Sequence, residues 1–239
     1  MALLETRRLS RDFGGLRAVA SLDLDVREGE ILGFIGPNGA GKTTVFNLVT
    51  GFVRPTEGEI RFEGRSLVGL RPHAIAARGV ARTFQVVKPF MGLTVRENVT
   101  LAAFLRHRSR RDAEARAEAV LAKLGLSHRG DSLASQLTLM DQKRLEMARA
   151  LATGPRLILL DEPMGGLNAS EVDVAAGLVV QLRASGITVI LVEHVMKAIM
   201  RISDRVVVIN YGQKIADGPP AEVVRDEKVI AAYFGTRAA

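Results

Sequence analysis

The stretch Gly36–Thr43, which reads GPNGAGKT, decides the fold of this 239-residue chain. It matches the pattern G-x-x-x-x-G-K-[ST] and lies between an apolar run that ends at Ile35 and a helical pattern that begins at Lys42. A strand, a glycine-rich loop and a helix in this order form a phosphate-binding loop. Its backbone N–H groups surround phosphate oxygens, and the positive end of the following helix points at them. The sequence therefore predicts a nucleoside triphosphate site.

The residues of the loop have separate expected roles. Lys42 is expected to reach the β- and γ-phosphates, and the Thr43 hydroxyl is expected to ligate Mg²⁺. The loop therefore predicts Mg²⁺ together with ATP or GTP as the bound groups. The residues expected to bind the nucleotide here are Gly36, Pro37, Asn38, Gly39, Ala40, Gly41, Lys42, Thr43 and Thr44.

Acidic residues follow a second apolar strand pattern, Leu157–Leu160, which ends at Asp161 and Glu162. Ligands collect at the carboxyl ends of strands in parallel sheets. Asp161 is expected to hold Mg²⁺ through water, and Glu162 is expected to polarise an attacking water. The strand that ends at Val192 brings His194 to the same edge as a candidate γ-phosphate contact.

Strand and helix patterns alternate along most of the chain, which predicts an α/β fold with a largely parallel sheet. Roughly the first 65 residues favour a small antiparallel sheet beside it. The expected strands are Ser21–Val26, Glu30–Ile35, Val80–Phe84, Leu157–Leu160, Ile187–Val192 and Arg205–Asn210. The expected helices are Lys42–Val49, Asp112–Leu124, Gln142–Leu151 and Ser170–Arg183, the last with Ser170 as a candidate N-cap.

Lys42 and Asp161 are 119 residues apart, which is too far for one intervening α/β unit. The segment between them is mainly helical in pattern. The sequence therefore predicts a single domain, 1–239, with a helical subdomain inserted at about 86–151.

Composition limits the classes of partner. The formal net charge is +7, and much of the basic excess lies in Arg106–Arg111. This charge is typical of a solvated basic surface, and it also permits contact with anionic lipid or nucleic acid. The chain has no cysteine, which excludes disulfides and thiolate metal sites. It has no secretory signal pattern and no apolar run long enough to cross a membrane.

Further motifs follow the phosphate loop in order: Gln85 in ARTFQ, the segment LEMARAL, LILLDEP at 157–163, GGLN and VEHVM. Together they resemble the nucleotide-binding subunits of ABC transporters over essentially the whole chain. The resemblance implies that Gln85 ligates Mg²⁺ and senses a transmembrane partner. It also implies that Glu162 is the general base, that His194 is the switch histidine, and that Phe13 in DFGG stacks on adenine.

Within that family, the segments FGGLRAV, ARTFQ, LTVRENV and the C-terminal tail are similar to importers of branched-chain and other hydrophobic amino acids. The resemblance implies transmembrane permease subunits and a second ABC ATPase as partners, a solute-binding protein as an indirect one, and no nucleic acid. It also implies a peripheral location on the cytoplasmic face of the inner membrane.

The sequence departs from the family pattern where the signature LSGGQ is expected, because residues 137–141 read LTLMD. Thr138 can replace the serine hydroxyl. Leu139 and Met140 are expected to block close backbone approach, and Asp141 to place a negative charge near the partner's triphosphate. The turn GGLN also has Asn168 where the family has aspartate.

Two alternatives stay open beside the importer ATPase, and a third does not fit the chain. One is a regulatory nucleotide-binding subunit with little turnover, which the altered signature favours and intact Glu162 and His194 oppose. Another is an importer ATPase for a different small solute. A soluble ABC ATPase of translation or DNA repair would need two cassettes or a long coiled-coil insertion, and 239 residues with one phosphate loop fit neither.

Overall fold

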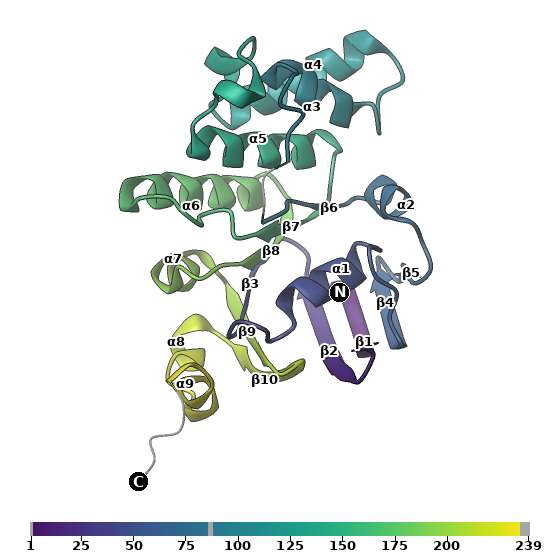
Figure 1. The fold of residues 1–239 in the computed structure, drawn as a ribbon, viewed down its shortest axis with the longest axis vertical. Coiled ribbons are helices and arrows are strands. Elements are labelled where there is room, and N and C mark those ends of the chain that lie inside the picture. Colours follow the sequence, from purple (N-terminus) through teal and green to yellow (C-terminus); the bar gives the residue numbers. More distant parts are fainter. Residues whose placement is uncertain (1, 86–87, 235–239) are drawn as a thin grey trace.

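The computed structural model describes residues 2–85 and 88–234 (Figure 1). Its central sheet has the order β10-β9-β3-β8-β7-β6, in which β9 and β10 pair antiparallel and the other neighbours pair parallel. The strands are β3 (Ile31–Ile35), β6 (Val80–Arg82), β7 (Leu157–Asp161), β8 (Thr188–Val192), β9 (Arg205–Asn210) and β10 (Gln213–Gly218). Every residue of β3, β7 and β8 is buried, as expected for strands covered on both faces. The predicted α/β fold is confirmed.

The predicted antiparallel sheet is also present, in the order β2-β1-β4-β5. Its strands are β1 (Ala2–Phe13), β2 (Leu16–Arg27), β4 (Glu57–Phe62) and β5 (Arg65–Ser66). Helix α1 (Lys42–Val49) lies between this sheet and the central one (Figure 1). Its Val45, Phe46 and Val49 share one hydrophobic core with residues of both sheets. The helix that follows the phosphate loop is thereby held from two sides.

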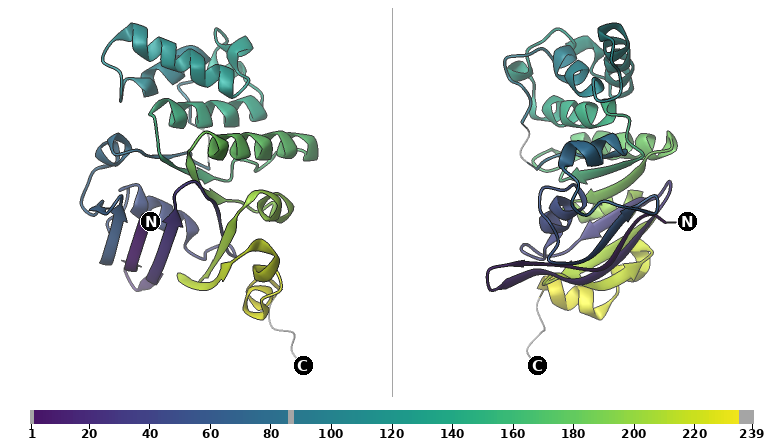
Figure 2. Two further views of the ribbon diagram at one scale, coloured as in Figure 1. Left: turned by 180° about the vertical axis from the view of Figure 1, so that it is seen from behind. Right: turned by 90° about the vertical axis from the view of Figure 1, so that its right-hand side faces the viewer.

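The other face of the central sheet packs on helices. Helices α6 (Ala169–Ala184) and α7 (Met196–Ile202) cover it, and the short helices α8 (Pro220–Val223) and α9 (Glu227–Phe234) lie beside β9 and β10 (Figure 2). Among the described residues, no helix is long and apolar enough to cross a membrane.

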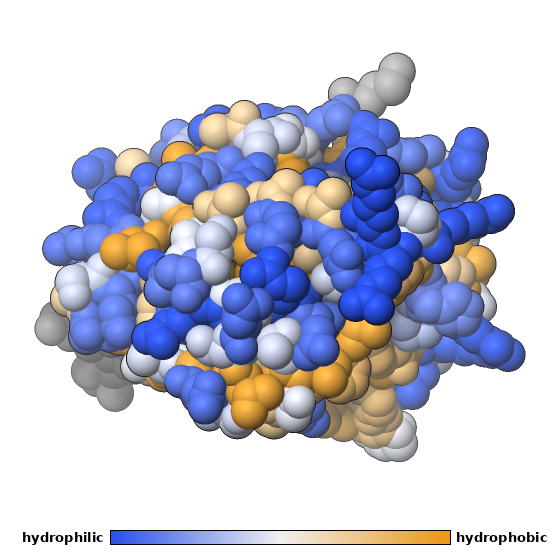
Figure 3. Space-filling view, turned by 90° about the horizontal axis from the view of Figure 1, so that it is seen from above, coloured by the Kyte–Doolittle hydropathy of each residue, from blue (hydrophilic) through white to orange (hydrophobic). Residues whose placement is uncertain are grey.

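Helices α3 (Val95–Ala103), α4 (Arg110–Lys123) and α5 (Leu139–Ala152) form one end of the molecule, between β6 and β7 in the chain (Figures 1 and 2). They fall in the segment for which the sequence predicts the helical subdomain, and the predicted boundary at residue 86 lies outside the described residues. Short 3-10 turns at Ser127–Arg129 and Ala134–Gln136 connect α4 to α5. Seen from above, this end is largely hydrophilic (Figure 3). The helix α2 (Pro72–Ala77) precedes β6.

The differences from the sequence prediction include the starts of two helices near the site. The N-cap of α6 is Asn168, whose side chain accepts a hydrogen bond from the Glu171 N–H, while Ser170 lies inside the first turn. Helix α5 begins at Leu139 rather than at Gln142, because Thr138 caps it. Asn168 and Thr138 are both good N-caps, but polar residues nearby in the sequence made the starting points ambiguous.

Candidate active site

The phosphate loop connects the buried end of β3 to α1, and close backbone contacts require glycine at two of its positions, Gly36 and Gly41. A Cβ atom on Gly36 would collide with the Ile209 carbonyl oxygen. A Cβ atom on Gly41 would lie 2.5 Å from the Ala18 carbonyl oxygen, and Gly41 has a φ of +105°. The loop is therefore confined between β2 and the end of β9.

The side chain of Lys42 turns into this loop. Its Nζ donates hydrogen bonds to the carbonyl oxygens of Gly36, at 2.6 Å, and of Pro37, at 2.9 Å. Burial lowers the pKa of Lys42, while the nearby carboxylates of Glu162 and Asp161 raise it. The ammonium group thus lies where the loop would enclose phosphate oxygens.

Glu162 follows β7 and has a left-handed backbone, with a φ of +50°. One carboxylate oxygen lies 2.9 Å from His194 Nε2, and the other accepts a hydrogen bond from Gln85 Nε2 at 3.0 Å. Lys143 donates to the Glu162 carbonyl oxygen at 2.7 Å. Gln85 and His194, which belong to distant motifs, therefore meet at the carboxylate of Glu162.

Glu193 supports the position of His194. Its carboxylate is almost fully buried and accepts hydrogen bonds from the backbone N–H groups of Met164 and His194. Burial raises the pKa of Glu193, and these backbone donors oppose the change. The segment that carries His194 is thereby tied to the segment that follows Glu162.

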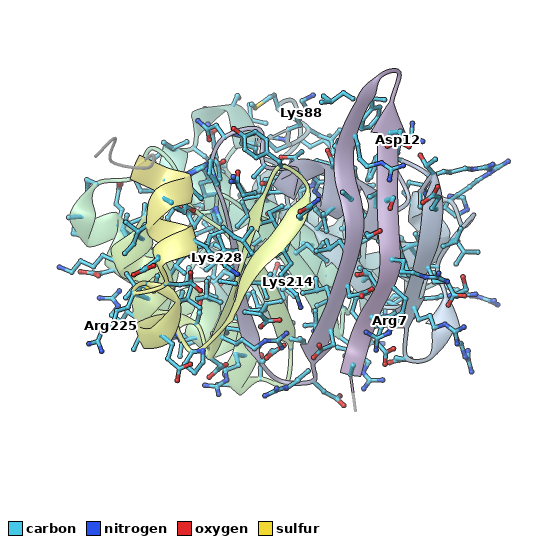
Figure 4. All side chains as sticks on the ribbon, turned by 90° about the horizontal axis from the view of Figure 1, so that it is seen from below. Arg7, Asp12, Lys88, Lys214, Arg225 and Lys228 are labelled. Atoms are coloured by element: carbon cyan, nitrogen blue, oxygen red, sulfur yellow. The ribbon has the colours of Figure 1, made fainter. Side chains whose placement is uncertain are left out.

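Most of the predicted site residues line one cavity of about 780 Å³. They are Phe13, Asn38, Gly39, Ala40, Gly41, Lys42, Thr43, Thr44, Gln85, Glu162 and His194. Gly36 and Pro37 lie in the loop but do not line this cavity. Phe13 follows Asp12 toward the tip of the β1–β2 hairpin (Figure 4), is 43% exposed, and has the Arg11 guanidinium 4.5 Å from its ring centre.

Asp161 lines a second cavity, of about 700 Å³. Thr43 and Gln85 line both cavities, so the three predicted Mg²⁺ ligands lie where the two cavities adjoin. Hydroxyl, amide and carboxylate oxygens suit a hard divalent cation. This donor set fits Mg²⁺.

Two residues of the site have no signal in the sequence analysis. Tyr211, in the turn between β9 and β10, lines the larger cavity. Its turn is held in place because Gly212 donates to the Ala40 carbonyl and accepts from the Ala20 N–H, each at 2.9 Å. The other residue is Arg82, which contacts Asp161. A tyrosine in a turn and an arginine in a strand are too common to indicate a site.

The segment 137–141 differs from expectation in two of its side chains. Leu139 is 44% exposed, but Met140 is 7% exposed and belongs to the hydrophobic core. Asp141 is also buried, with Arg144 at 3.4 Å and Arg129 at 3.9 Å. The helix turns Met140 and Asp141 inward, so Leu139 is the bulky side chain left on the surface beside Thr138.

The fold and the site together define a P-loop nucleotide-binding ATPase cassette. A family model described as "ABC transporter" matches residues 19–165, and one described as "Branched-chain amino acid ATP-binding cassette transporter" matches 213–239. The chain belongs to the ABC transporter family. The class predicted from the sequence motifs, an ATP-hydrolysing transporter subunit, is confirmed.

Several relatives and solved structures are similar along nearly the whole chain. The high-affinity branched-chain amino acid transport ATP-binding proteins BraF of Pseudomonas aeruginosa and LivG of Escherichia coli are 43% and 41% identical, each over 98% of both chains. A nucleotide-free ATP-binding cassette from an ABC transporter has a TM-score of 0.90 and 30% identity, covering 98% of this chain and 100% of its own. A cassette in its ADP conformation has a TM-score of 0.90 and 31% identity, covering 98% and 99%.

Proposed function

We propose that this protein is the ATP-binding subunit of an importer of branched-chain or other hydrophobic amino acids, and that it binds and hydrolyses Mg·ATP to drive uptake. The observation that carries the ATPase assignment is the position of Glu162 between Gln85 and His194 at the nucleotide cavity. The solute class is supported by the match of the tail, 213–239, and by the printed names of relatives that share 41–43% identity.

The residues divide the chemical work. Lys42 and the loop N–H groups bind the phosphates, and Phe13 offers a ring face to the base. Thr43, Asp161 and Gln85 would hold Mg²⁺, which would supply positive charge to neutralise the charge that develops on the phosphates. Glu162 orients a water molecule and accepts its proton, and His194 contacts the γ-phosphate.

We place the subunit on the cytoplasmic face of the inner membrane, bound to permease subunits that receive the solute from a binding protein. The rim of the second cavity supports a protein contact, because Phe52 and Phe84 form an exposed edge-to-face pair beside Gln85, with ring centres 5.6 Å apart. A second ABC ATPase would complete this chain's nucleotide site with its signature segment, and residues 137–141 of this chain would face the partner's site.

A regulatory subunit with little turnover is the second candidate, and exposed Leu139 in the signature segment favours it. Uptake by liposomes that contain the permeases, the second ATPase and this subunit distinguishes the importer ATPase from the regulatory subunit. The importer ATPase predicts ATP-driven leucine, isoleucine and valine uptake that stops with Glu162→Gln in this chain. Uptake that persists with this variant would assign the turnover to the other ATPase.

A further inference from the structure

Arg82 joins three parts of the site. It is the last residue of β6 and lies three residues before Gln85 in the chain. Its guanidinium donates to Asp161 Oδ2 at 2.9 Å, and the two side chains are 5% and 3% exposed. It also donates to Asn47 Oδ1 at 2.5 Å, on the helix that follows the phosphate loop. One cation therefore links the helix α1, the strand β7 and the segment that leads to Gln85.

Two aromatic rings flank the same guanidinium. Its carbon lies 5.5 Å from the ring centre of Phe46 and 5.0 Å from that of Phe84. These contacts and the two hydrogen bonds leave Arg82 little freedom to move. Its Nε is buried and has no hydrogen-bond partner among the described residues.

Stability alone does not account for this arrangement. Burying an ion pair costs desolvation of both charges, and well-packed apolar residues are often as stable or more so. An unpaired buried N–H adds to the cost. A role in function would account for the cost of burying this ion pair. The neighbours of Arg82 indicate the role, because Arg82 lines the same cavity as the predicted metal ligands Thr43, Gln85 and Asp161.

A carboxylate that binds a metal must present the right oxygen in the right direction. Arg82 bonds Asp161 Oδ2, which leaves Oδ1 without this partner. The backbone of Asp161 is held as well, since its N–H donates to the Thr83 hydroxyl at 3.1 Å. Outer hydrogen-bond partners of this kind orient metal ligands, and losing one typically costs roughly 10- to 100-fold in metal affinity or activity.

We propose that Arg82 is a positioning residue for the magnesium site: it holds the Asp161 carboxylate in its metal-binding orientation from the strand that leads into Gln85. The inference rests on the proposed function, because it assumes that Mg·ATP binds at this site. It assigns to Arg82 no direct contact with the nucleotide.

The test compares ATP affinity of the full chain in excess Mg²⁺ and in EDTA, measured by calorimetry on Arg82→Gln and Arg82→Lys. Arg82→Gln is expected to keep the EDTA affinity and to lose about 10- to 100-fold of the gain that Mg²⁺ provides. Arg82→Lys is expected to restore only part of it, since one ammonium cannot reproduce the fork that reaches both Asn47 and Asp161.

Arg149→Gln is the matched control. Arg149 lines the same cavity, pairs with Glu146 at 3.1 Å and lies 5.2 Å from the Phe90 ring centre. Within the described part of the chain it contacts none of the three predicted metal ligands. Its loss is expected to leave the gain from Mg²⁺ unchanged.

Arg82→Gln leaves a buried charge on Asp161 and can fail to fold. In that case Arg82→Lys and Asn47→Ala decide, because Asn47→Ala loosens Arg82 without removing the ion pair and is expected to reduce the Mg²⁺ gain less. Folded variants that keep the full gain would overturn the inference. An equal loss of ATP affinity in Mg²⁺ and in EDTA would overturn it too, since it indicates a purely structural role. A wild-type chain with no gain from Mg²⁺ would instead refute the Mg·ATP site.

Discussion

Met140 and Leu139 are neighbours in the signature segment, yet replacing each with glycine should lower the stability of the fold by very different amounts. Met140 is 7% exposed and packs in the core, so Met140→Gly removes a buried side chain and leaves a cavity. Emptying such a site to alanine costs about 2–5 kcal/mol. Glycine in a helix costs about 1 kcal/mol more. Met140→Gly is therefore expected to lower the free energy of unfolding by about 3–6 kcal/mol.

Leu139→Gly should cost less, about 1–2 kcal/mol, because Leu139 is 44% exposed and loses only part of the burial energy of a core leucine in addition to the helix term. Urea unfolding followed by circular dichroism measures both variants, and the chain has no tryptophan to follow by fluorescence. Similar slopes against urea would show that the unfolded states are comparable. If Met140→Gly unfolds at the same urea concentration as Leu139→Gly, the inward position of Met140 is wrong.

Leu139→Gly also tests whether the exposed side chain of Leu139 obstructs the partner's nucleotide site. In the assembled transporter, Leu139→Gly is expected to raise ATP hydrolysis, because the exposed side chain would no longer keep the start of α5 away from the partner's nucleotide. One well-placed donor to developing negative charge is worth roughly 10²–10³-fold, which sets the upper limit of the gain. Unchanged hydrolysis with Leu139→Gly in a folded, assembled complex would show that the LTLMD segment is not obstructed by this side chain.

Four other predictions concern the site. Lys42→Ala should abolish tight Mg·ATP binding, and calorimetry that finds wild-type affinity would refute the assignment of the loop. Glu162→Gln should keep ATP binding but slow ATP hydrolysis by about 10²–10⁴-fold. The control Glu171→Gln preserves the helix cap and should hydrolyse ATP at the wild-type rate. Equal hydrolysis rates for the two variants would place the general base elsewhere. The purified chain alone should hydrolyse ATP slowly, because a homodimer offers LTLMD to both sites, and a high basal rate would show a competent signature. Burial raises the pKa of Glu193 above its ordinary 4.5, so the folded protein binds this proton more tightly than the unfolded chain does. The stability of the wild type relative to Glu193→Gln should therefore fall as pH rises from about 4.5 to the raised pKa. A difference in urea unfolding that does not depend on pH would contradict this.

Local sequence was sufficient for the phosphate loop and for the central strands. The motif at Gly36–Thr43 joins a strand to a helix within a few residues, so its spacing alone specifies the turn. The run Leu157–Leu160 is apolar throughout because β7 is buried on both faces, and that pattern identified the strand and the acidic residues that follow it. Helix starts were less well determined, as the caps at Asn168 and Thr138 show.

The sequence by itself determined the kind of site: a triphosphate loop, a carboxylate pair and a histidine at one edge of a parallel sheet. Only the tertiary structure decided how these residues act on one another. Arg82 meets Asp161 across 79 residues of chain, and Gln85 and His194 reach Glu162 from different segments. It also decided that Met140 is buried and Leu139 exposed. The physical reason is that such contacts depend on which face of an element packs against its neighbours, and residues far apart in the chain carry no local pattern that records it.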